Sequence, residues 1–436
     1  MQAELSTILL FLAVSLTLVL GVGIWIGVAL MVIGYLGLTL FTPTPALSVM
    51  GTAIWTSVSS WSLAALPLFI WMGEILFRTK ISENLFRGLA PWLGALPGRL
   101  LHVNVIGCGI FAAVSGSSAA TTATVGRMSL PELKKRGYDE GIAIASLAGS
   151  GTLGLLIPPS IIMIVYGVAA EVSIVRLFIA GIIPGLLLMF LFSSYIAVWS
   201  TFNKHLVPPL EPQAPFFEKI KSTAELIPIV MLIAGVIASI YLGWATATEA
   251  AVVGVIGSLC ISWFTKTLNW KSFRDSLMGA TSLSCMIILI IAGAAFLTSM
   301  MAYTGVPKAL AAAVIELDVN RYVMLAFLLL LYLILGCFID GISMIVLTTA
   351  VVLPVIQAAG FDLIWFGIFI VIVVELAQIT PPVGFNLFVL QGLTQKSIFY
   401  ITKVTIPFFL LMIFLVVMIT VFPELVTWLP SKMLAR

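Results

Sequence analysis

The stretch "GSGTLGLLIPPS", residues 149–160, decides the fold, because its glycines weaken a helix and its prolines end one. It sits inside the apolar segment 138–170, which is long enough to cross a bilayer as a helix. Pro158 and Pro159 have no amide hydrogen to donate, and their rings clash with the carbonyls of the preceding turn. We therefore predict a helix that is broken in the middle of the membrane.

The same glycines, Gly149, Gly151 and Gly154, also match the Gly-x-Gly-x-x-Gly fingerprint of dinucleotide sites. That fingerprint needs a β-strand before it and an uninterrupted helix after it. Here an apolar, helix-like run precedes the glycines and a Pro-Pro pair follows them. A nucleotide site is therefore excluded.

Composition places the whole chain in lipid. Of 436 residues, 61% are hydrophobic and 9% are charged, whereas soluble domains carry about 25% charged residues. Apolar runs of spanning length recur, for example Ile182–Val198, Leu226–Leu242, Met286–Met301 and Ile406–Val421. We predict an all-α polytopic membrane protein whose first run, which holds Glu4 and no basic residue, is a retained helix rather than a signal peptide.

No catalytic or metal-binding motif is visible. The four cysteines and two histidines (Cys108, Cys260, Cys285, Cys337, His102 and His205) are scattered through the chain, with no spacing typical of a disulfide framework or a metal site. Neither histidine has a convincing nucleophile and carboxylate as partners. We expect no enzyme, no catalytic residue and no nucleic-acid partner.

Basic residues indicate the orientation. Most of them fall in connections on one side of the predicted spans: Arg78, Lys80, Arg87 and Arg99; Lys134, Lys135 and Arg136; Lys204, Lys219 and Lys221; Lys266, Lys271 and Arg274; Lys396 and Lys403. The positive-inside rule puts this side in the cytoplasm and both termini outside, which is the periplasm of a bacterium. Two of these connections, residues 215–225 and 266–276, mix aromatic and basic residues as amphipathic arms do. Plain solvated loops remain the alternative.

The chain contains an internal repeat. Four short matches recur in the same order: Ser115-Gly116 with Asp340-Gly341, Leu130-Pro131 with Leu353-Pro354, Gly137-Tyr138-Asp139 with Gly360-Phe361-Asp362, and Pro158-Pro159 with Pro381-Pro382. The offset is 223 from the Leu-Pro match onward, with a two-residue gap before it. Lys134 and its neighbours mark the base of the first copy as cytoplasmic, while "QAAGFD" at the base of the second has no basic residue. Inverted copies with interrupted spans are typical of secondary transporters.

Each copy also predicts a re-entrant hairpin before its broken helix. In the first copy, short apolar arms flank "SGSS" at 115–118. Such backbone is tolerated at membrane depth only when protein buries it or it lines a wet cavity. The expected organisation is N-terminal scaffold helices at 1–80; a first transport unit at 81–200, with a hairpin about 100–136 and a broken helix about 138–170; scaffold helices and cytoplasmic arms at 201–300; a second transport unit at 301–400, with a hairpin about 321–358 and a broken helix about 361–392; and a C-terminal helix at 401–436.

Broken helices expose backbone groups that can bind ions. Freed carbonyls suit a hard cation such as Na⁺, and freed amides at a helix start suit a carboxylate. Polar side chains that can add ligands are Ser115, Ser117, Ser118 and Thr152 in the first copy, and Asp340, Thr380 and Asn386 in the second. Close helix packing by small residues is the alternative, but it does not explain two Pro-Pro breaks at matching places.

Acidic residues within apolar runs are functional candidates. Asp340, at the second hairpin tip, is the strongest. Glu375 comes next, and it can ligand a cation, relay a proton or pair with a helix terminus. We expect Glu249 to lie in the first turn of a helix that Thr246 or Thr248 caps. We expect Glu74 to pair with Arg78, four residues later in the sequence.

Four motifs carry a family resemblance: "VSGSSAATTATVG" at 114–126, "AGSGTLGLLIPPS" at 148–160, "GWATATEAA" at 243–251 and "ITPPVGFNLFV" at 379–389. Together they resemble the large, DctM-like membrane subunit of tripartite ATP-independent periplasmic (TRAP) transporters. The resemblance implies an elevator-type fold like that of the ion transporter superfamily, in the bacterial inner membrane. It also implies Na⁺-driven uptake of an organic acid, no organic cofactor, a separate small four-helix membrane subunit, and a soluble periplasmic binding protein that delivers the substrate.

The resemblance also implies site residues. The first Na⁺ site would use Ser115, Ser118, Gly154, Ile157 and Pro158, and the second would use Gly336, Asp340, Ala377, Thr380 and Pro381. Substrate would lie between the tips, near Ser117, Thr152, Pro382 and Asn386. Two departures stand out: Ala377-Gln378 replaces the family's common Gly-Leu, and Ala247 replaces a proline. The alternatives are a self-sufficient Na⁺/dicarboxylate symporter, or a membrane-embedded enzyme or channel.

Overall fold

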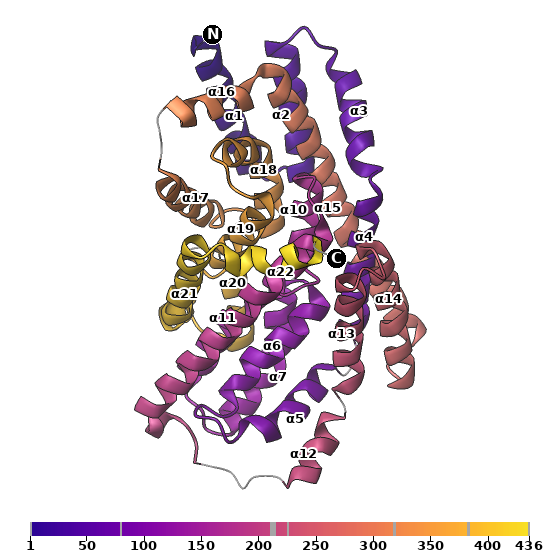
Figure 1. The fold of residues 1–436 in the computed structure, drawn as a ribbon. Coiled ribbons are helices and arrows are strands. Elements are labelled where there is room, and N and C mark those ends of the chain that lie inside the picture. The colour runs from indigo at the N-terminus through magenta and orange to yellow at the C-terminus, as the bar shows by residue number, and fades with distance from the viewer. Residues whose placement is uncertain are drawn as a thin grey trace.

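The computed structural model describes residues 2–78, 81–209, 215–224, 226–316, 320–381 and 384–434, and these parts are helices joined by short connections (Figure 1). The helices, with two 3₁₀ turns, are α1 Gln2–Gly21, α2 Ile26–Phe41, α3 Ala46–Val58, η1 Trp61–Ala64, α4 Ala65–Phe77, α5 Ile81–Leu93, α6 Leu101–Ser115, α7 Ser118–Lys135, α8 Glu140–Gly151, α9 Leu153–Leu156, α10 Ile161–Ala169, α11 Ile174–Phe202, η2 Lys204–Leu206, α12 Phe216–Thr223, α13 Ile227–Tyr241, α14 Ala247–Phe264, α15 Trp270–Thr304, α16 Val306–Glu316, α17 Arg321–Leu335, α18 Gly341–Ala358, α19 Leu363–Gln378, α20 Phe385–Thr394, α21 Ile398–Val421 and α22 Glu424–Leu434.

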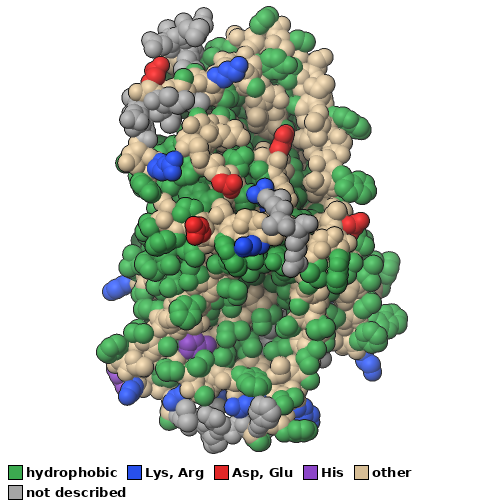
Figure 2. All heavy atoms as spheres, viewed as in Figure 1, with side chains coloured by type: hydrophobic (Ala, Val, Ile, Leu, Met, Phe, Trp, Pro, Cys, Tyr) green, Lys and Arg blue, Asp and Glu red, His purple; other side chains and the backbone are tan. Residues whose placement is uncertain are grey.

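Several of these helices match a bilayer in length and apolarity. Five described helices qualify alone, namely α11, α14, α15, α18 and α21, and two bent pairs raise the total to seven. The bent pairs are α3 with η1–α4, at 55°, and α8–α9 with α10, at 41°. Apolar side chains cover much of the visible surface (Figure 2), and Leu10, Phe190 and Trp244 each expose more than half of their area. Such a surface is stable in lipid and not in water.

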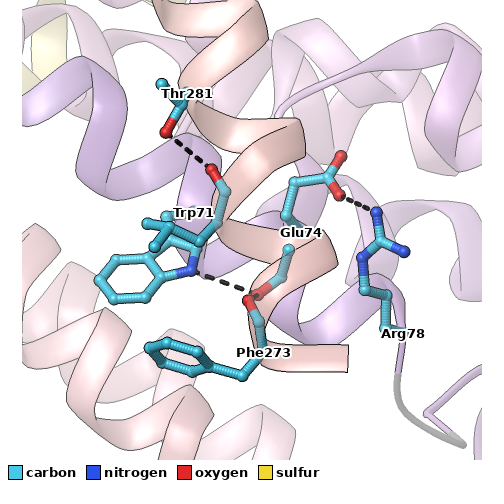
Figure 3. A network of polar contacts seen from close by, with 7 residues as sticks. Trp71, Glu74, Arg78, Phe273 and Thr281 are labelled. Atoms are coloured by element: carbon cyan, nitrogen blue, oxygen red, sulfur yellow. Dashed lines mark hydrogen bonds and ion pairs between the residues drawn. The ribbon is translucent and has the colours of Figure 1, made fainter. Parts of the chain in front are cut away.

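The long helix α15 organises one side of the molecule, where it packs against α2, α3 and α4. Near its start, Trp71 of α4 donates its indole hydrogen to Ser276 Oγ at 3.3 Å, and Phe273 lies edge-on to the same indole (Figure 3). On α4 itself, Arg78 pairs with Glu74 at 3.0 Å, as predicted. Both partners are partly exposed, so this pair stabilises the helix by at most about 1 kcal/mol.

Local sequence explains how the neighbouring helices begin. Thr246, rather than Thr248, caps α14 by accepting from the Glu249 amide. The Glu249 carboxylate in turn accepts from the Thr246 amide, which completes a capping box. The predicted arm 215–225 contains the short helix α12. The predicted arm 266–276 is wrong as a separate element: Asn269 caps α15, and the residues that follow form the first turns of that helix. An amphipathic pattern fits the exposed end of a long helix as well as it fits an isolated arm.

The two repeat copies have matching helix bounds. Helix α18, Gly341–Ala358, begins and ends 223 residues after α7, Ser118–Lys135. Helix α19 likewise begins 223 residues after α8, at Leu363 and Glu140. In Figure 1, α6 and α7 lie in the lower half of the molecule, and α17 and α18 lie in the upper half.

The shared Gly-aromatic-Asp motif starts the broken helix in each copy. Gly137 and Gly360 adopt positive φ angles of 81° and 74°, which favour glycine. Asp139 then accepts a bond from the Ile142 amide at 3.0 Å. Its counterpart, Asp362, accepts one from the Trp365 amide at 2.8 Å. Each copy therefore begins its broken helix with an aspartate cap.

One detail of the predicted alignment needs correction. Ser117 caps α7 and Asp340 caps α18, and these two residues are 223 positions apart. The constant offset therefore extends through the hairpin tip, and it pairs Asp340 with Ser117 rather than with Ser115. The two-residue gap arose because the Ser-Gly and Asp-Gly dipeptides look alike but occupy different positions in the two turns.

Candidate functional site

The first break lies between α9 and α10. A non-helical bend at residues 157–160 separates the two helices. Ser160 caps α10 by accepting from the Met163 amide at 3.4 Å. Because prolines cannot donate, Pro158 and Pro159 leave the carbonyls four residues earlier, on Gly154 and Leu155, without their usual helical donors. A continuous helix would supply a donor to each of these two carbonyls, and the proline pair does not.

The first hairpin tip packs directly on this break. Helix α6 ends at Gly116, whose φ of 57° is left-handed, and Ser117 then caps α7. A Cβ built on Gly154 would lie 2.5 Å from the Cα of Ser118 and 2.6 Å from its backbone nitrogen. A Cβ on Gly116 would lie 3.1 Å from the Pro159 carbonyl oxygen. Glycine at position 154 lets the two backbones meet.

Hydroxyl groups hold this tip in shape. Ser115 Oγ and Thr121 Oγ1 are hydrogen-bonded at 2.8 Å, and Thr121 Oγ1 also donates to the Ser117 carbonyl at 2.8 Å. Ser115 and Ser118 are both buried. The proposed members of the first ion site, Ser115, Ser118 and Gly154, are thus brought together around one turn.

The second tip and break show related packing. Helix α19 ends at Gln378 and α20 starts at Phe385. A Cβ on Gly336 would lie 2.2 Å from the Cβ of Ala377, so Gly336 provides the room for this alanine. Cys337 Sγ donates to the Pro381 carbonyl at 3.4 Å. Gly336, Ala377 and Pro381, three of the predicted members of the second ion site, are therefore neighbours.

Two other members of this site have local partners. Asp340 caps α18, accepting from the amides of Ile342 and Ser343 at 3.1 and 3.2 Å and from Ser343 Oγ at 2.5 Å. Thr380 Oγ1 donates to the Leu376 carbonyl at 2.7 Å. Both side chains keep free lone pairs, because a carboxylate and a hydroxyl each accept more than one bond.

The predicted substrate residues lie in different surroundings. Ser117 is at the tip, where its Oγ accepts from the Ala120 amide at 3.4 Å. Thr152 is fully buried and donates to the Gly149 carbonyl at 2.6 Å. Asn386 is also fully buried, and its amide oxygen and nitrogen have no partner among the described residues. Pro382 lies outside the described residues.

Glu375 is the least expected feature of the site. Its side chain, only 1% exposed, extends from α19 of the second copy into the first. Its Oε1 accepts from Ser118 Oγ and, at 2.9 Å, from the Leu155 amide. Its Oε2 has no partner in the part of the chain that the structure describes. The bond from the Leu155 amide fits one of the roles left open by the sequence, pairing with a helix terminus, because Leu155 lies in the first turn of α9.

Other chemistry is not assembled nearby. Among the described residues, no three His, Cys, Asp or Glu side chains form a metal-binding group. An apolar pocket at the first break lies between Pro158 and Pro159 on one side and Val236 and Ile240 of α13 on the other. Cys108 is fully buried in α6.

Comparisons with known proteins agree on one family. The model of the DctM component of the tripartite ATP-independent periplasmic transporter matches residues 11–425. The chain is 32% identical to the isethionate TRAP transporter permease protein DctMQ of Oleidesulfovibrio alaskensis over 94% of its own length, and it spans 64% of that longer relative. It is 30% identical to the C4-dicarboxylate TRAP transporter large permease protein DctM of Rhodobacter capsulatus, covering 98% of this chain and 99% of the relative. These relatives are named as transport permeases, not enzymes.

A solved structure shares the fold. The YdaH transporter of Alcanivorax borkumensis superposes with a TM-score of 0.62 over 86% of this chain and 89% of that chain, at 13% sequence identity. At this identity the likeness concerns the fold alone. The described residues form the helices and apolar spans that the sequence predicted for a polytopic membrane protein.

Proposed function

Since the chain belongs to the DctM family of tripartite ATP-independent periplasmic transporters, we propose that it is the large membrane subunit of a Na⁺-driven importer of an organic acid. A separate small membrane subunit would enlarge its scaffold, and a periplasmic binding protein would deliver the substrate. Named relatives carry isethionate, C4-dicarboxylates and sialic acid. A small organic acid is therefore the expected substrate.

The observation that carries this proposal is the contact of the first tip with the first break. Gly154 lies so close to the backbone of Ser118 that no side chain would fit between them. The carbonyl of Gly154 also lacks its helical donor, because Pro158 has no amide hydrogen. Hydroxyl and carbonyl oxygens gathered in this way suit Na⁺, a hard cation. We assign the first ion site to Ser115, Ser118, Gly154, Ile157 and Pro158, and the second to Gly336, Asp340, Ala377, Thr380 and Pro381.

The packing of the two copies supports an inverted repeat. Helix α10 of the first copy packs on α18 of the second, and the equivalent pair, α20 and α7, also pack together. In the same way α11 packs on α19, and α21 packs on α8. Helices of each copy thus pack against helices of the other, and in this proposal the substrate is held between the two tips.

The proposal includes an elevator motion and an orientation in the membrane. The two copies would move together against the scaffold helices α2, α3, α4 and α13 to α15. Helix α7 ends in Lys134 and Lys135, so its lower end in Figure 1 would face the cytoplasm of a bacterial inner membrane. Both chain termini would then be periplasmic.

The test is uptake into proteoliposomes. The chain is reconstituted with the small membrane subunit and the binding protein of the same operon, and uptake of labelled organic acids, including succinate and sialic acid, is measured with an inward Na⁺ gradient. We expect uptake that requires both Na⁺ and the soluble protein. Uptake without any soluble protein would favour a self-sufficient symporter, and a conductance far above carrier rates would favour a channel.

A further inference from the structure

One carboxylate oxygen joins parts of both repeat copies. Oε1 of Glu375, in α19, accepts hydrogen bonds from Ser118 Oγ and from the Leu155 amide at 2.9 Å. Ser118 is the first residue of α7 at the hairpin tip, and Leu155 lies in α9, directly before the break. The second copy therefore fixes the distance between the tip and the break of the first.

The direction of the bond from Ser118 matters for cation binding. A serine hydroxyl has one hydrogen to donate and two lone pairs with which to accept. A hydroxyl that binds a cation must point its hydrogen away from that cation. Because Ser118 donates to Glu375, both lone pairs of its oxygen remain free on the side away from the carboxylate.

The bond from Leu155 acts on the other half of the same site. It anchors α9, a single short turn of Leu153–Leu156. The neighbouring Gly154 supplies a carbonyl that lacks its helical donor because of Pro158. Because Gly154 packs against the backbone of Ser118, holding this turn in place also keeps its carbonyl group close to the tip.

We infer that Glu375 is a positioning residue for the first Na⁺ site: it orients the Ser118 hydroxyl and anchors the Gly154 carbonyl across the repeat boundary. The inference rests on the proposed function, since it assumes that Na⁺ binds at the first tip. It differs from direct coordination, in which the carboxylate itself would touch the ion. Partners behind metal ligands typically change affinity by about 10- to 100-fold when removed.

Two substitutions of Glu375 separate the effect of side-chain length from the effect of the negative charge. Glu375→Asp keeps the charge but withdraws the carboxylate by about 1.5 Å, one carbon–carbon bond, so both donors lose their acceptor. Glu375→Gln keeps the length and one acceptor oxygen but removes the charge. Positioning predicts that Asp raises the half-saturating Na⁺ concentration by about 10-fold or more, and that Gln stays within about three-fold of the unsubstituted protein, since a neutral acceptor is only moderately weaker than a charged one.

The measurement needs no substrate. The thermal unfolding midpoint of the purified full-length chain is recorded in detergent as NaCl replaces choline chloride at constant ionic strength, and the midpoint shift gives the half-saturating Na⁺ concentration. Glu74→Gln is the matched control, because Glu74 is a partly exposed acid paired with Arg78 on α4. It should leave that concentration unchanged. If the Asp variant does not fold, Glu375→Met, of similar length but without an acceptor, carries the same expectation.

A double substitution tests whether Glu375 acts through Ser118. Ser118→Ala with Glu375→Asp should raise the half-saturating Na⁺ concentration by less than the product of the two single effects, because both changes disturb one interaction. Independent, multiplying effects would overturn the inference. A Gln variant impaired more than the Asp variant would also overturn it, in favour of a charged direct ligand.

The outcomes distinguish this inference from the proposed function. If NaCl gives no more stabilisation than choline chloride to the unsubstituted protein, the Na⁺-driven function itself fails. If that protein responds to Na⁺ and Glu375→Asp responds at the same concentration, only the positioning role fails.

Discussion

The contact between Gly154 and the first hairpin tip can be tested with a single methyl group. In Gly154→Ala the new Cβ would lie 2.5 Å from the Cα of Ser118, 2.6 Å from its nitrogen and 2.7 Å from the carbonyl carbon of Ser117. All three atoms belong to the backbone, so no side-chain rotation relieves the overlap. Ordinary contact begins near 3.4 Å, and the tip must therefore move by about 1 Å.

The size of the effect follows from this displacement. Overpacking of this kind costs about 1–3 kcal/mol, and the better helix propensity of alanine offsets about 1 kcal/mol of it. Cation ligands tolerate shifts of only about 0.2 Å. We therefore expect Na⁺ to bind at least about 10-fold more weakly, which removes about 1.4 kcal/mol of Na⁺-linked stabilisation at saturating salt.

The assay is the thermal unfolding midpoint of the full chain in NaCl and in choline chloride. Gly235→Ala is the control, because this glycine lies within α13 and a Cβ there would meet no atom within 4 Å. It should gain the same helix propensity and keep the full Na⁺ response. Equal Na⁺ responses in the two variants would refute the idea that the tip and the break form an ion site by close backbone contact.

Three further outcomes follow from the same site. Asp340→Ala should destabilise the chain by about 1 kcal/mol through the lost cap and weaken the Na⁺ response. Asp340→Asn keeps the cap, so its thermal unfolding midpoint in choline chloride should be near that of the unsubstituted chain. A clear loss of stability in Asp340→Asn would contradict the capping role. Gly336→Ala, whose Cβ would lie 2.2 Å from that of Ala377, should weaken the Na⁺ response as Gly154→Ala does; an unchanged titration would remove Gly336 from the second site. Cys337, which is partly exposed, should react with a membrane-impermeant thiol reagent at a rate that changes with Na⁺, whereas buried Cys108 should not react; labelling of Cys108 would show that α6 opens.

Local chemistry made the breaks predictable from the sequence. The consecutive prolines Pro158 and Pro159 remove two amide donors in a row and break the helix, whereas the single prolines of the repeat motif lie inside their helices, α7 and α18. The aspartate of Gly137-Tyr138-Asp139 caps the helix that follows it. These effects act within a few residues, so the pattern predicts them without knowledge of the rest of the fold. The pairing of Glu74 with Arg78, four residues apart, was predictable for the same reason.

Contacts across the fold were not predictable in this way. Glu375 was recognised as a buried acid, but its partners, Ser118 and Leu155, lie 257 and 220 residues away in the sequence. No periodicity relates residues at that distance. The burial of Cys108 depends in the same way on helices that pack around α6 only in three dimensions.

The aspartate caps of α8 and α19 have a consequence for how such a chain can arise. A cap depends on the chirality of the backbone, and this is unchanged when a segment is turned over in the bilayer. A duplicated segment of the protein that inserted into the bilayer in the opposite orientation would therefore keep its helix starts. It would need new residues only in the connections whose basic side chains set the orientation. The shared caps Asp139 and Asp362 fit such a duplication, and Lys134 and Lys135, which have no basic counterpart near Gln357, fit a reversal of the second copy.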